Sequence, residues 1–248
     1  MVILKTAEEI ERIKEASVIV ATVLQKLQRE IRPAVTTRDL DKYAEELAIS
    51  EGAVPLFKGY HGYPSALCIS VNEEVIHGLP SSRKIARGDI VSLDFGVLYN
   101  GFCGDAAITV AVGDVSPQIR RLLDVTQNAL DAAIATAKVG CRLGDISAAV
   151  QGCAEKAGFS VVRDFVGHGI GRKMHEDPAV PNFGKRGSGI PLREGMVLAI
   201  EPMVNEGLSE VKVLSDGWTV VTADGRLSAH FEHTVAITKD GPEILSRL

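Results

Sequence analysis

The chain has 248 residues and a net charge of −5, with a pI near 5.7, so nucleic acid is not expected as its main ligand. A composition of 46% hydrophobic and 24% charged residues is ordinary for a soluble globular protein of one large or two small domains. No apolar run reaches membrane-spanning length, the N-terminus lacks a signal-peptide core, and four widely spaced cysteines predict a reducing compartment and no zinc finger.

Two helices are predicted near the N-terminus. Thr6 and Glu9 have the spacing of a capping box, and an amphipathic helix is expected to follow as far as about Arg29. Thr36 repeats this pattern with an aspartate three residues later, and the second helix is expected to stop at Gly52. Residues 53–112 then contain short apolar runs broken by Gly, Pro and Asn, which is typical of strands and loops.

A β-hairpin is predicted from Ile90 to Val112, because Asn-Gly at positions 100 and 101 is a strong signal for a two-residue turn. Such a turn places Asp94 opposite Ala107 and, two residues on, Asp105 opposite a glycine. One face then carries both aspartates, and the other is apolar, with Val91, Leu93, Phe95, Val97, Ile108, Val110 and Val112. Two adjacent carboxylates repel, so a positive group is expected between them, although a solvated polar sheet face would give the same pattern.

Two more helices are predicted in the second half of the chain. The third opens at Ser116 and is expected to end at Gly140, and the fourth is expected to be capped by Asp145 and closed by Gly158. From residue 159 onward the sequence returns to strands and glycine-rich loops. Helices followed by strands, twice over, predict an α+β fold with a mostly antiparallel sheet.

Two glutamates lie where folding alone would not place a carboxylate, in or beside apolar runs. Glu201 precedes Pro202, which should end its strand, and Glu232 is expected to share a strand face with His230 and Thr234. Each glutamate alone is more typical of a hydrogen-bonded polar residue than of a metal ligand.

His168 is the strongest imidazole candidate, because Gly167 and Gly169 leave room for close backbone approach. His175 lies just downstream of the same loop. Carboxylate oxygens with one imidazole suit Mn²⁺, Fe²⁺, Co²⁺ or Zn²⁺ better than a thiolate-bound structural zinc. Two such ions can share a water and lower its pKa, and a nearby imidazole can stabilise an oxyanion, which indicates metal-assisted hydrolysis of an acyl compound.

Five motifs taken together go beyond this general chemistry: GYHGYPSALCISVNEEVIHGLP, SLDFG followed by GFCGDAA, FVGHGIGRKMHEDP, GMVLAIEPM and SAHFEHTVAIT. Through them the chain closely resembles type 1 methionine aminopeptidase over nearly its whole length. The resemblance implies the pita-bread fold, in which two pseudo-symmetric halves surround a mostly antiparallel sheet. It also implies one catalytic domain over residues 1–248.

The resemblance implies a centre of two divalent ions, each of which could be Co, Mn, Fe, Zn or Ni. In the family pattern Asp105 and Glu232 bridge both ions. His168 and Glu201 complete one ion, and Asp94 completes the other. Glu201 would also take the proton from the bridging water.

Other residues acquire roles only through the resemblance. His175 would stabilise the tetrahedral oxyanion, and His77 would contact the scissile amide and help the leaving amine. The methionine pocket would be formed by Tyr60, Tyr63, Cys68, Met174 and Trp218, for which plain core packing is the alternative. A monovalent cation, Na or K, would bind near Asn72, Glu74 and Ser228.

Three positions depart from the commonest pattern of the family. Ala106 stands where Thr or Ser is frequent, Met174 where an aromatic residue is frequent, and His230 where Gln is frequent. None of these removes a metal ligand, so they bear on kinetics and metal preference more than on activity.

The implied function is the removal of the initiator methionine from nascent proteins and peptides when the next residue is small. The resemblance implies a cytoplasmic monomer whose partners are nascent N-termini, with the ribosome as a further candidate and with neither membrane nor nucleic acid. Two alternatives stay open: a proline-directed aminopeptidase or dipeptidase of the same fold, and a non-catalytic protein of that fold that binds partners.

Overall fold

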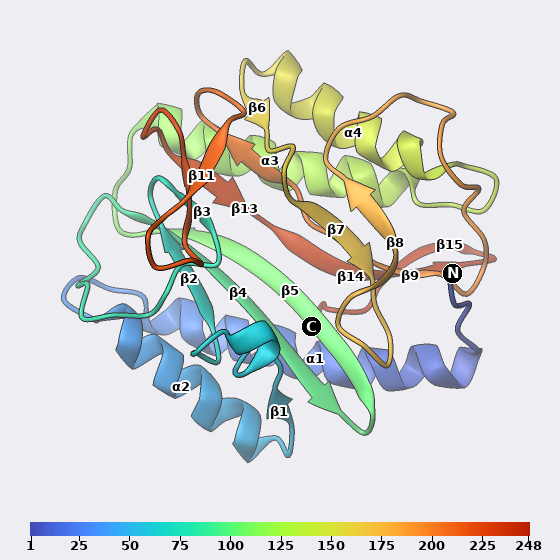
Figure 1. The fold of residues 1–248 in the computed structure, drawn as a ribbon, viewed down its shortest axis with the longest axis horizontal. Helices are drawn as coiled ribbons and strands as arrows, with labels where there is room; N and C mark the ends of the chain where they lie inside the picture. The colour runs from blue at the N-terminus through green and yellow to red at the C-terminus, as the bar shows by residue number, and fades with distance from the viewer.

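The computed structural model describes residues 1–248 and contains four helices packed on a large sheet (Figure 1). The helices are α1 (Ala7–Glu30), α2 (Thr37–Ser50), α3 (Pro117–Thr136) and α4 (Leu143–Lys156), with a 3-10 turn η1 (Tyr60–Gly62). The strands are β1 (Val54–Pro55), β2 (Cys68–Val71), β3 (Glu74–Ile76), β4 (Ile90–Tyr99), β5 (Phe102–Ala111), β6 (Ser160–Val161), β7 (Val166–Gly169), β8 (Glu176–Pro181), β9 (Val197–Ile200), β10 (Met203–Asn205), β11 (Val211–Val213), β12 (Val220–Thr222), β13 (Ser228–His230), β14 (Glu232–Thr238) and β15 (Gly241–Ile244). None of the helices combines the length and apolarity that crossing a membrane would need.

The large sheet has nine strands, and every strand pair in it is antiparallel. Its main path runs β1-β4-β5-β14-β9-β7-β8, with β2 added to β4 and β15 added to β14. Two three-stranded sheets, β13-β10-β6 and β11-β12-β3, complete the structure. The predicted α+β class with a mostly antiparallel sheet is therefore confirmed.

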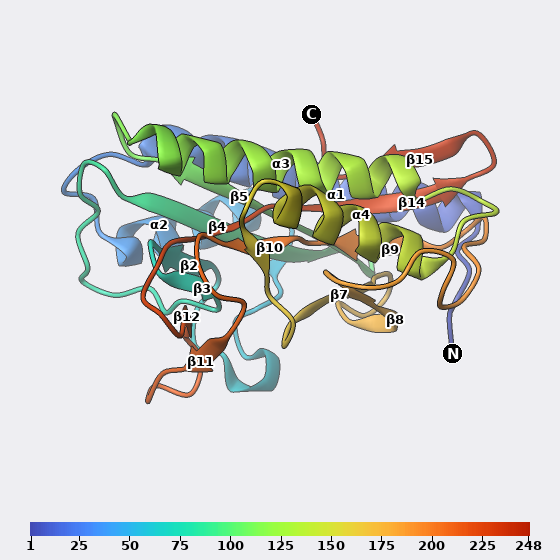
Figure 2. The ribbon, with the colours of Figure 1, turned by 90° about the horizontal axis from the view of Figure 1, so that it is seen from above.

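Each half of the sheet has its own pair of helices. Helix α1 packs on β4 and β5 and also contacts α2, whereas α3 and α4 pack against each other over the second half of the sheet. Figure 2 shows α1 and α3 on one side of the large sheet and β11–β12 on the other, with the β7–β8 end of the sheet lying away from α1 and α3. The helices thus cover one face, and the opposite face is left for loops and short strands.

Both capping boxes at the N-terminus are confirmed. The Thr6 hydroxyl accepts a hydrogen bond from the Glu9 N–H at 3.2 Å, and the Glu9 carboxylate accepts one from the Thr6 N–H at 3.1 Å. Thr36 and Asp39 make the same reciprocal pair at the start of α2. Helix α1 extends to Glu30, one residue beyond the expected end.

Two helix boundaries in the second half were predicted wrongly. Helix α3 ends at Thr136, because the chain leaves helical geometry at the next residue, and Gly140 takes its left-handed φ of 94° in the turn that follows. Asp145 is not the N-cap of α4. It lies inside the first turn, and its carboxylate accepts a hydrogen bond from the Arg142 N–H at 2.7 Å. The carboxylate thus provides an acceptor for the backbone of the N-cap residue, Arg142.

The predicted hairpin register is confirmed, with Asp94 paired to Ala107 and Gly96 paired to Asp105. Asn100 and the glycine after it both have positive φ, at 47° and 80°, as a tight two-residue turn requires. The apolar face of the hairpin contributes to a hydrophobic core beneath α1 and α2. Its polar face is turned toward the other side of the sheet.

The contact between α1 and β5 is close enough to give a stability prediction. A Cβ added at Gly104 would lie 2.5 Å from the Ser17 nitrogen and 2.7 Å from the Ala16 carbonyl carbon, both of which belong to the α1 backbone. We expect Gly104→Ala to lower the free energy of unfolding by roughly 1–3 kcal/mol or more, because helix and sheet must separate. Urea denaturation measures this change.

Gly152 in α4 provides the matched control, because a Cβ there would meet nothing within 4 Å. Gly152→Ala should raise the free energy of unfolding by about 0.5–1 kcal/mol, since alanine is the better helix former. Equal stability of Gly104→Ala and wild type would contradict the close packing of α1 on β5.

Candidate metal centre

The polar face of the β4–β5 hairpin meets β14 near the centre of the large sheet. Ala107 on β5 pairs with Asp94 on one side and with Glu232 on the other, so the two carboxylates lie in one row across three strands. Thr234 joins β14 to β5, because its hydroxyl donates to the Asp105 carbonyl at 2.7 Å and accepts the Asp105 N–H at 3.3 Å. The strand register therefore gathers three of the four acidic residues.

Strands β7 and β9 bring the remaining two candidates to the same place. His168 on β7 pairs with Ala199 on β9, and Glu201 follows the last residue of β9. A Cβ at Gly167 would overlap the Ala199 carbonyl oxygen and lie 3.1 Å from Cγ of Glu201, and one at Gly169 would overlap a β8 carbonyl oxygen. The predicted close backbone approach around His168 is confirmed.

The expected strand face shared by His230, Glu232 and Thr234 is only partly correct. Glu232 and Thr234 lie on β14, but His230 ends β13, and the chain breaks regular geometry at Phe231 between them. The reason is that β13 pairs with β10 in a separate sheet. Thr109 fixes the backbone there, accepting the His230 N–H at 2.9 Å and donating to its carbonyl at 2.7 Å.

The five candidate ligands converge on one point in the interior. His168 Nε2 lies 3.6 Å from Glu201 Oε1 and 4.0 Å from Asp105 Oδ2. Asp105, His168 and Glu232 each present a ligand atom, and these atoms all lie within 4.8 Å of one another. One carboxylate oxygen each of Asp94, Asp105 and Glu232 is buried without any hydrogen-bond partner.

These residues fit a divalent metal centre. A buried carboxylate oxygen without a hydrogen-bond donor is costly, and a metal ion is the partner that several converging carboxylates share most effectively. Oxygen-rich sites with one imidazole are typical of first-row divalent ions. His230 adds a further unpartnered group, because neither of its buried ring nitrogens has a hydrogen bond and its Nε2 lies 3.9 Å from Glu201 Oε2.

The electrostatics of the cluster reflect its burial. Burial raises the pKa of Asp94 to about 7, and burial followed by the charge of Asp94 raises the pKa of Asp105 well above its usual value. Burial likewise raises the pKa values of Glu201 and Glu232 well above normal. Burial lowers the pKa of His168 to about 4, so its imidazole is neutral near pH 7 and offers a lone pair.

Two more histidines stand at the edge of the cluster. The His175 ring lies beside that of His168, with centroids 4.2 Å apart, and its Nδ1 is 2.7 Å from the Tyr60 hydroxyl. Desolvation lowers the pKa of His175, and burial lowers the pKa of His77 to about 4. The His77 ring meets the Phe165 ring edge-on at 5.7 Å.

A cavity of about 320 Å³ opens beside the cluster. Its lining includes all the residues singled out from the sequence as ligands, acid–base groups or pocket residues: Asp94, Asp105, His168, Glu201, Glu232, His77, His175, Tyr60, Tyr63, Cys68, Met174 and Trp218. The sequence reasoning missed Phe57, His61, Ile76, Asp164, Phe165 and Val166. Most of these are apolar residues with no local pattern that would separate cavity lining from ordinary core.

The three residues expected near a monovalent cation lie around the start of β3. The Ser228 N–H donates to the Asn72 carbonyl at 3.0 Å, and Glu74 lies two residues after Asn72. Their side chains already have protein partners, because the Asn72 amide donates to Asp89 at 2.9 Å and the Glu74 carboxylate pairs with Arg83 at 2.9 Å.

Comparison with known proteins gives a family. The model of metallopeptidase family M24 matches residues 11–239 of this chain. The methionine aminopeptidase of Clostridium perfringens is 55% identical over 246 residues, covering 99% of each chain. Methionine aminopeptidase 1 of Bacillus subtilis is 49% identical over 248 residues, covering 100% of each.

Solved structures agree with the sequence relatives. The methionine aminopeptidase of Thermotoga maritima has a TM-score of 0.98 and 48% identity, with 100% of both chains covered. A prolidase of Pyrococcus furiosus has a TM-score of 0.81 and 25% identity, and the match covers 99% of this chain but 66% of the prolidase. Both neighbours have the pita-bread fold, so the fold expected from the motifs is confirmed.

Proposed function

The chain belongs to metallopeptidase family M24, and we propose that it removes the N-terminal methionine from proteins and peptides whose second residue is small. The observation that carries this function is the cluster of four carboxylates and one imidazole beside a cavity lined by soft, apolar side chains. Relatives that match over nearly the whole chain bear the name methionine aminopeptidase, which supports the same assignment.

The cluster would hold two divalent ions through Asp94, Asp105, His168, Glu201 and Glu232. Bound there, such ions would lower the pKa of a water molecule and polarise the scissile carbonyl. The donor set is compatible with Mn, Fe, Co, Zn or Ni, since none of these ions is excluded by carboxylate and imidazole ligands.

Three side chains in and around the cluster have separate roles in the reaction. Glu201 accepts the proton of the attacking water, and burial raises the pKa of its carboxyl, which makes the carboxylate a stronger base. His175 donates an N–H to the oxyanion of the tetrahedral intermediate, and its lowered pKa keeps it a neutral donor. His77 contacts the scissile amide and assists the leaving amine.

Tyr60 fixes the tautomer of His175 in this scheme. An imidazole that donates from Nε2 must leave Nδ1 as an acceptor, and the Tyr60 hydroxyl 2.7 Å away is placed to donate to Nδ1. Tyr60 was expected to line the methionine pocket, and we propose that it also orients the oxyanion donor.

We expect Tyr60→Phe to lower kcat about 2- to 10-fold with little change in KM, as the loss of one hydrogen bond of roughly 0.5–1.5 kcal/mol implies. Steady-state kinetics on a Met-Ala-Ser peptide measure kcat and KM separately. Tyr99→Phe is the matched control, because Tyr99 ends β4 outside the cavity and should leave both constants unchanged. An unchanged kcat for Tyr60→Phe would contradict the tautomer role.

The methionine side chain would lie against Tyr63, Cys68, Met174 and Trp218, together with Tyr60. The Tyr63 hydroxyl donates to the Gly78 carbonyl at 2.9 Å, and its ring meets Trp218 edge-to-face with centroids 5.2 Å apart. Sulfur and aromatic groups of this kind suit a thioether, which supports methionine as the first residue of the substrate.

The monovalent cation is a secondary part of the proposal. Because the side chains of Asn72 and Glu74 are engaged elsewhere, a Na or K ion near Ser228 would depend on backbone carbonyl oxygens. We also propose that residues 1–248 act as one catalytic unit, since both halves of the chain supply ligands. The unit would work as a monomer in the cytoplasm on nascent chains, with the ribosome as a candidate partner.

Metal reconstitution separates an enzyme from a non-catalytic binding protein. Chelator-treated protein should release no methionine from Met-Ala-Ser, and addition of Mn²⁺ or Co²⁺ should restore release. Failure of Mn, Fe, Co, Zn and Ni each to restore turnover, although they bind, would favour the binding protein.

A further inference from the structure

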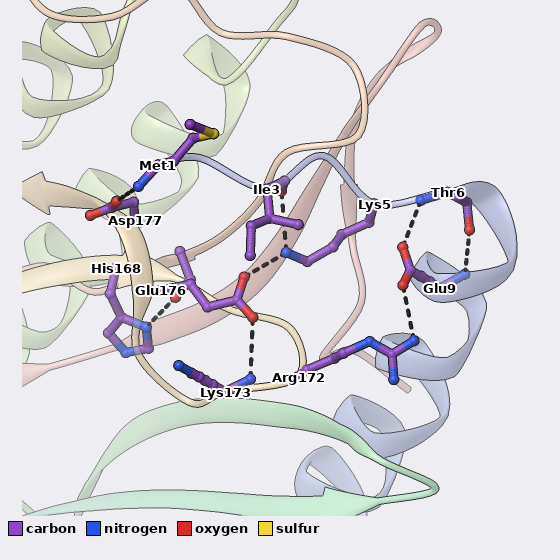
Figure 3. A network of polar contacts seen from close by, with 11 residues as sticks. Met1, Ile3, Lys5, Thr6, Glu9, His168, Arg172, Lys173, Glu176 and Asp177 are labelled. Carbon is purple, nitrogen blue, oxygen red and sulfur yellow. Dashed lines mark hydrogen bonds and ion pairs between the residues drawn. The ribbon is translucent and has the colours of Figure 1, made fainter.

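A buried ion pair lies outside the metal cluster, and none of the roles proposed above uses it. Lys5 Nζ is 2.5 Å from Glu176 Oε2, and the two side chains are only 4% and 6% exposed. Glu176 directly follows His175, the proposed oxyanion donor. Figure 3 shows Lys5 reaching from the segment before α1 to Glu176, next to the strand that carries His168.

The pair closes the turn that presents His175. The second oxygen of Glu176 accepts the Lys173 N–H at 3.2 Å, so one carboxylate spans the turn that contains Met174 and His175 (Figure 3). Lys5 binds the other oxygen and also donates to the Ile3 carbonyl at 3.2 Å. The side chain of Glu176 is therefore held at both oxygens, one by the turn and one by the N-terminal segment.

The surroundings pack closely on the pair. A Cβ at Gly171 would overlap Lys5 Cε and lie 2.8 Å from Glu176 Oε1, so the backbone of the loop packs directly on the pair. The Gly171 carbonyl accepts the Cys103 N–H at 2.8 Å, which ties the loop to β5. On the other side, the Lys5 N–H donates to the Gly195 carbonyl at 2.7 Å.

Stability alone does not explain such a pair. Removing two charges from water costs more than their attraction returns in many proteins, and apolar replacements often stabilise. A buried pair can instead fix a local geometry, and the geometry that this pair holds is that of the Lys173–Glu176 turn. Tyr60 holds the His175 ring, whereas the ion pair holds its backbone.

We propose that the Lys5–Glu176 pair is a positioning device for His175, which makes the segment before α1 part of the active site. The proposal rests on the oxyanion role of His175 given above. Lys5 does not line the cavity beside the metal ligands, and its side-chain hydrogen bonds go to Ile3 and Glu176, so it reaches His175 through the turn.

The test compares Lys5→Met in wild-type and His175→Ala backgrounds, with Mn²⁺-saturated protein and Met-Ala-Ser. Lys5→Met should lower kcat at least about 10-fold while KM stays within about 3-fold, because ground-state binding does not need the oxyanion donor. In the His175→Ala background the same change should cost less than about 2-fold, since residues that act as one unit are not additive.

A spectroscopic readout makes the test independent of turnover. In Zn²⁺-loaded, ¹⁵N-histidine-labelled protein the His175 signals are those missing from His175→Ala, and Lys5→Met should shift them. Lys14→Met is the matched control: Lys14 pairs with Glu243 at 2.7 Å and joins α1 to β15 at the surface, so its loss should change neither kcat nor the His175 signals.

If Lys5→Met does not fold, Lys5→Met/Glu176→Gln replaces it, because no unpaired buried charge then remains. The same losses and shifts are expected from the double variant. Unchanged His175 signals, a kcat within about 2-fold of wild type, a loss confined to KM, or an equal loss with and without His175 would each overturn the positioning role. Wild-type protein inactive with every metal would instead refute the proposed function, and the signals would still decide the inference.

Discussion

Glu201→Ala should fold as wild type does and lose at least about 10²-fold in kcat, the range expected when a general base is removed. The change also removes one of the proposed metal ligands, so the affinity for Mn²⁺ should fall as well. Steady-state kinetics on Met-Ala-Ser in metal-defined buffer, with a parallel calorimetric titration of Mn²⁺, measure both effects.

Although Glu201→Ala should lose activity, it should not lose stability in the presence of chelator. Because burial raises the pKa of Glu201 well above normal, its ionised form destabilises the folded state, and its removal should leave the melting temperature unchanged or higher. Glu210→Ala is the control, since Glu210 is exposed on a loop and should alter neither activity nor melting. Near-wild-type turnover of Glu201→Ala would refute its role as base and ligand.

Chelator-treated protein should lose stability as the pH rises from about 7 to 8, where the histidines, whose pKa values burial lowers, are neutral in both the folded and the unfolded state. The carboxylates of the cluster have raised pKa values in the folded state, so the folded protein binds more protons than the unfolded chain over this range. The free energy of unfolding then falls with increasing pH.

Saturating Mn²⁺ should reverse this trend, because metal binding needs the deprotonated carboxylates and becomes tighter as the pH rises. Thermal melts at pH 7, 7.5 and 8, with chelator or with Mn²⁺, test both directions. A melting temperature in chelator that climbs steadily with pH would show that the carboxylates are not destabilised by burial.

Local chemistry explains why part of this structure could be predicted from sequence. The β4–β5 register follows from a two-residue turn and a side-chain period of two, so Asp94 and Asp105 could be placed on one face without any long-range information. The capping box at Thr6 is equally local. The same reasoning failed for Asp145, because a carboxylate can accept a hydrogen bond from a free N–H at the helix start either as the N-cap residue or from inside the first turn.

Contacts between distant segments could not be predicted in this way. The hydrogen bond between Tyr60 and His175 spans 115 residues, and the ion pair between Lys5 and Glu176 spans 171. Neither leaves a spacing pattern in the sequence, because each depends on how two halves of the sheet meet. Phe165 is similar: it contacts His77 edge-on, yet in the sequence it is one apolar residue among many.

One competition measurement tests the central claim most directly. Mn²⁺-loaded protein is mixed with Met-Ala-Ser, Met-Lys-Ser and Ala-Pro-Ser, and the products are followed by mass spectrometry. We expect methionine to be released from Met-Ala-Ser, with little cleavage of Met-Lys-Ser, whose second residue is large, and none of Ala-Pro-Ser. Release of alanine from Ala-Pro-Ser with Met-Ala-Ser intact would contradict the methionine specificity and assign the protein to the proline-directed branch of its fold.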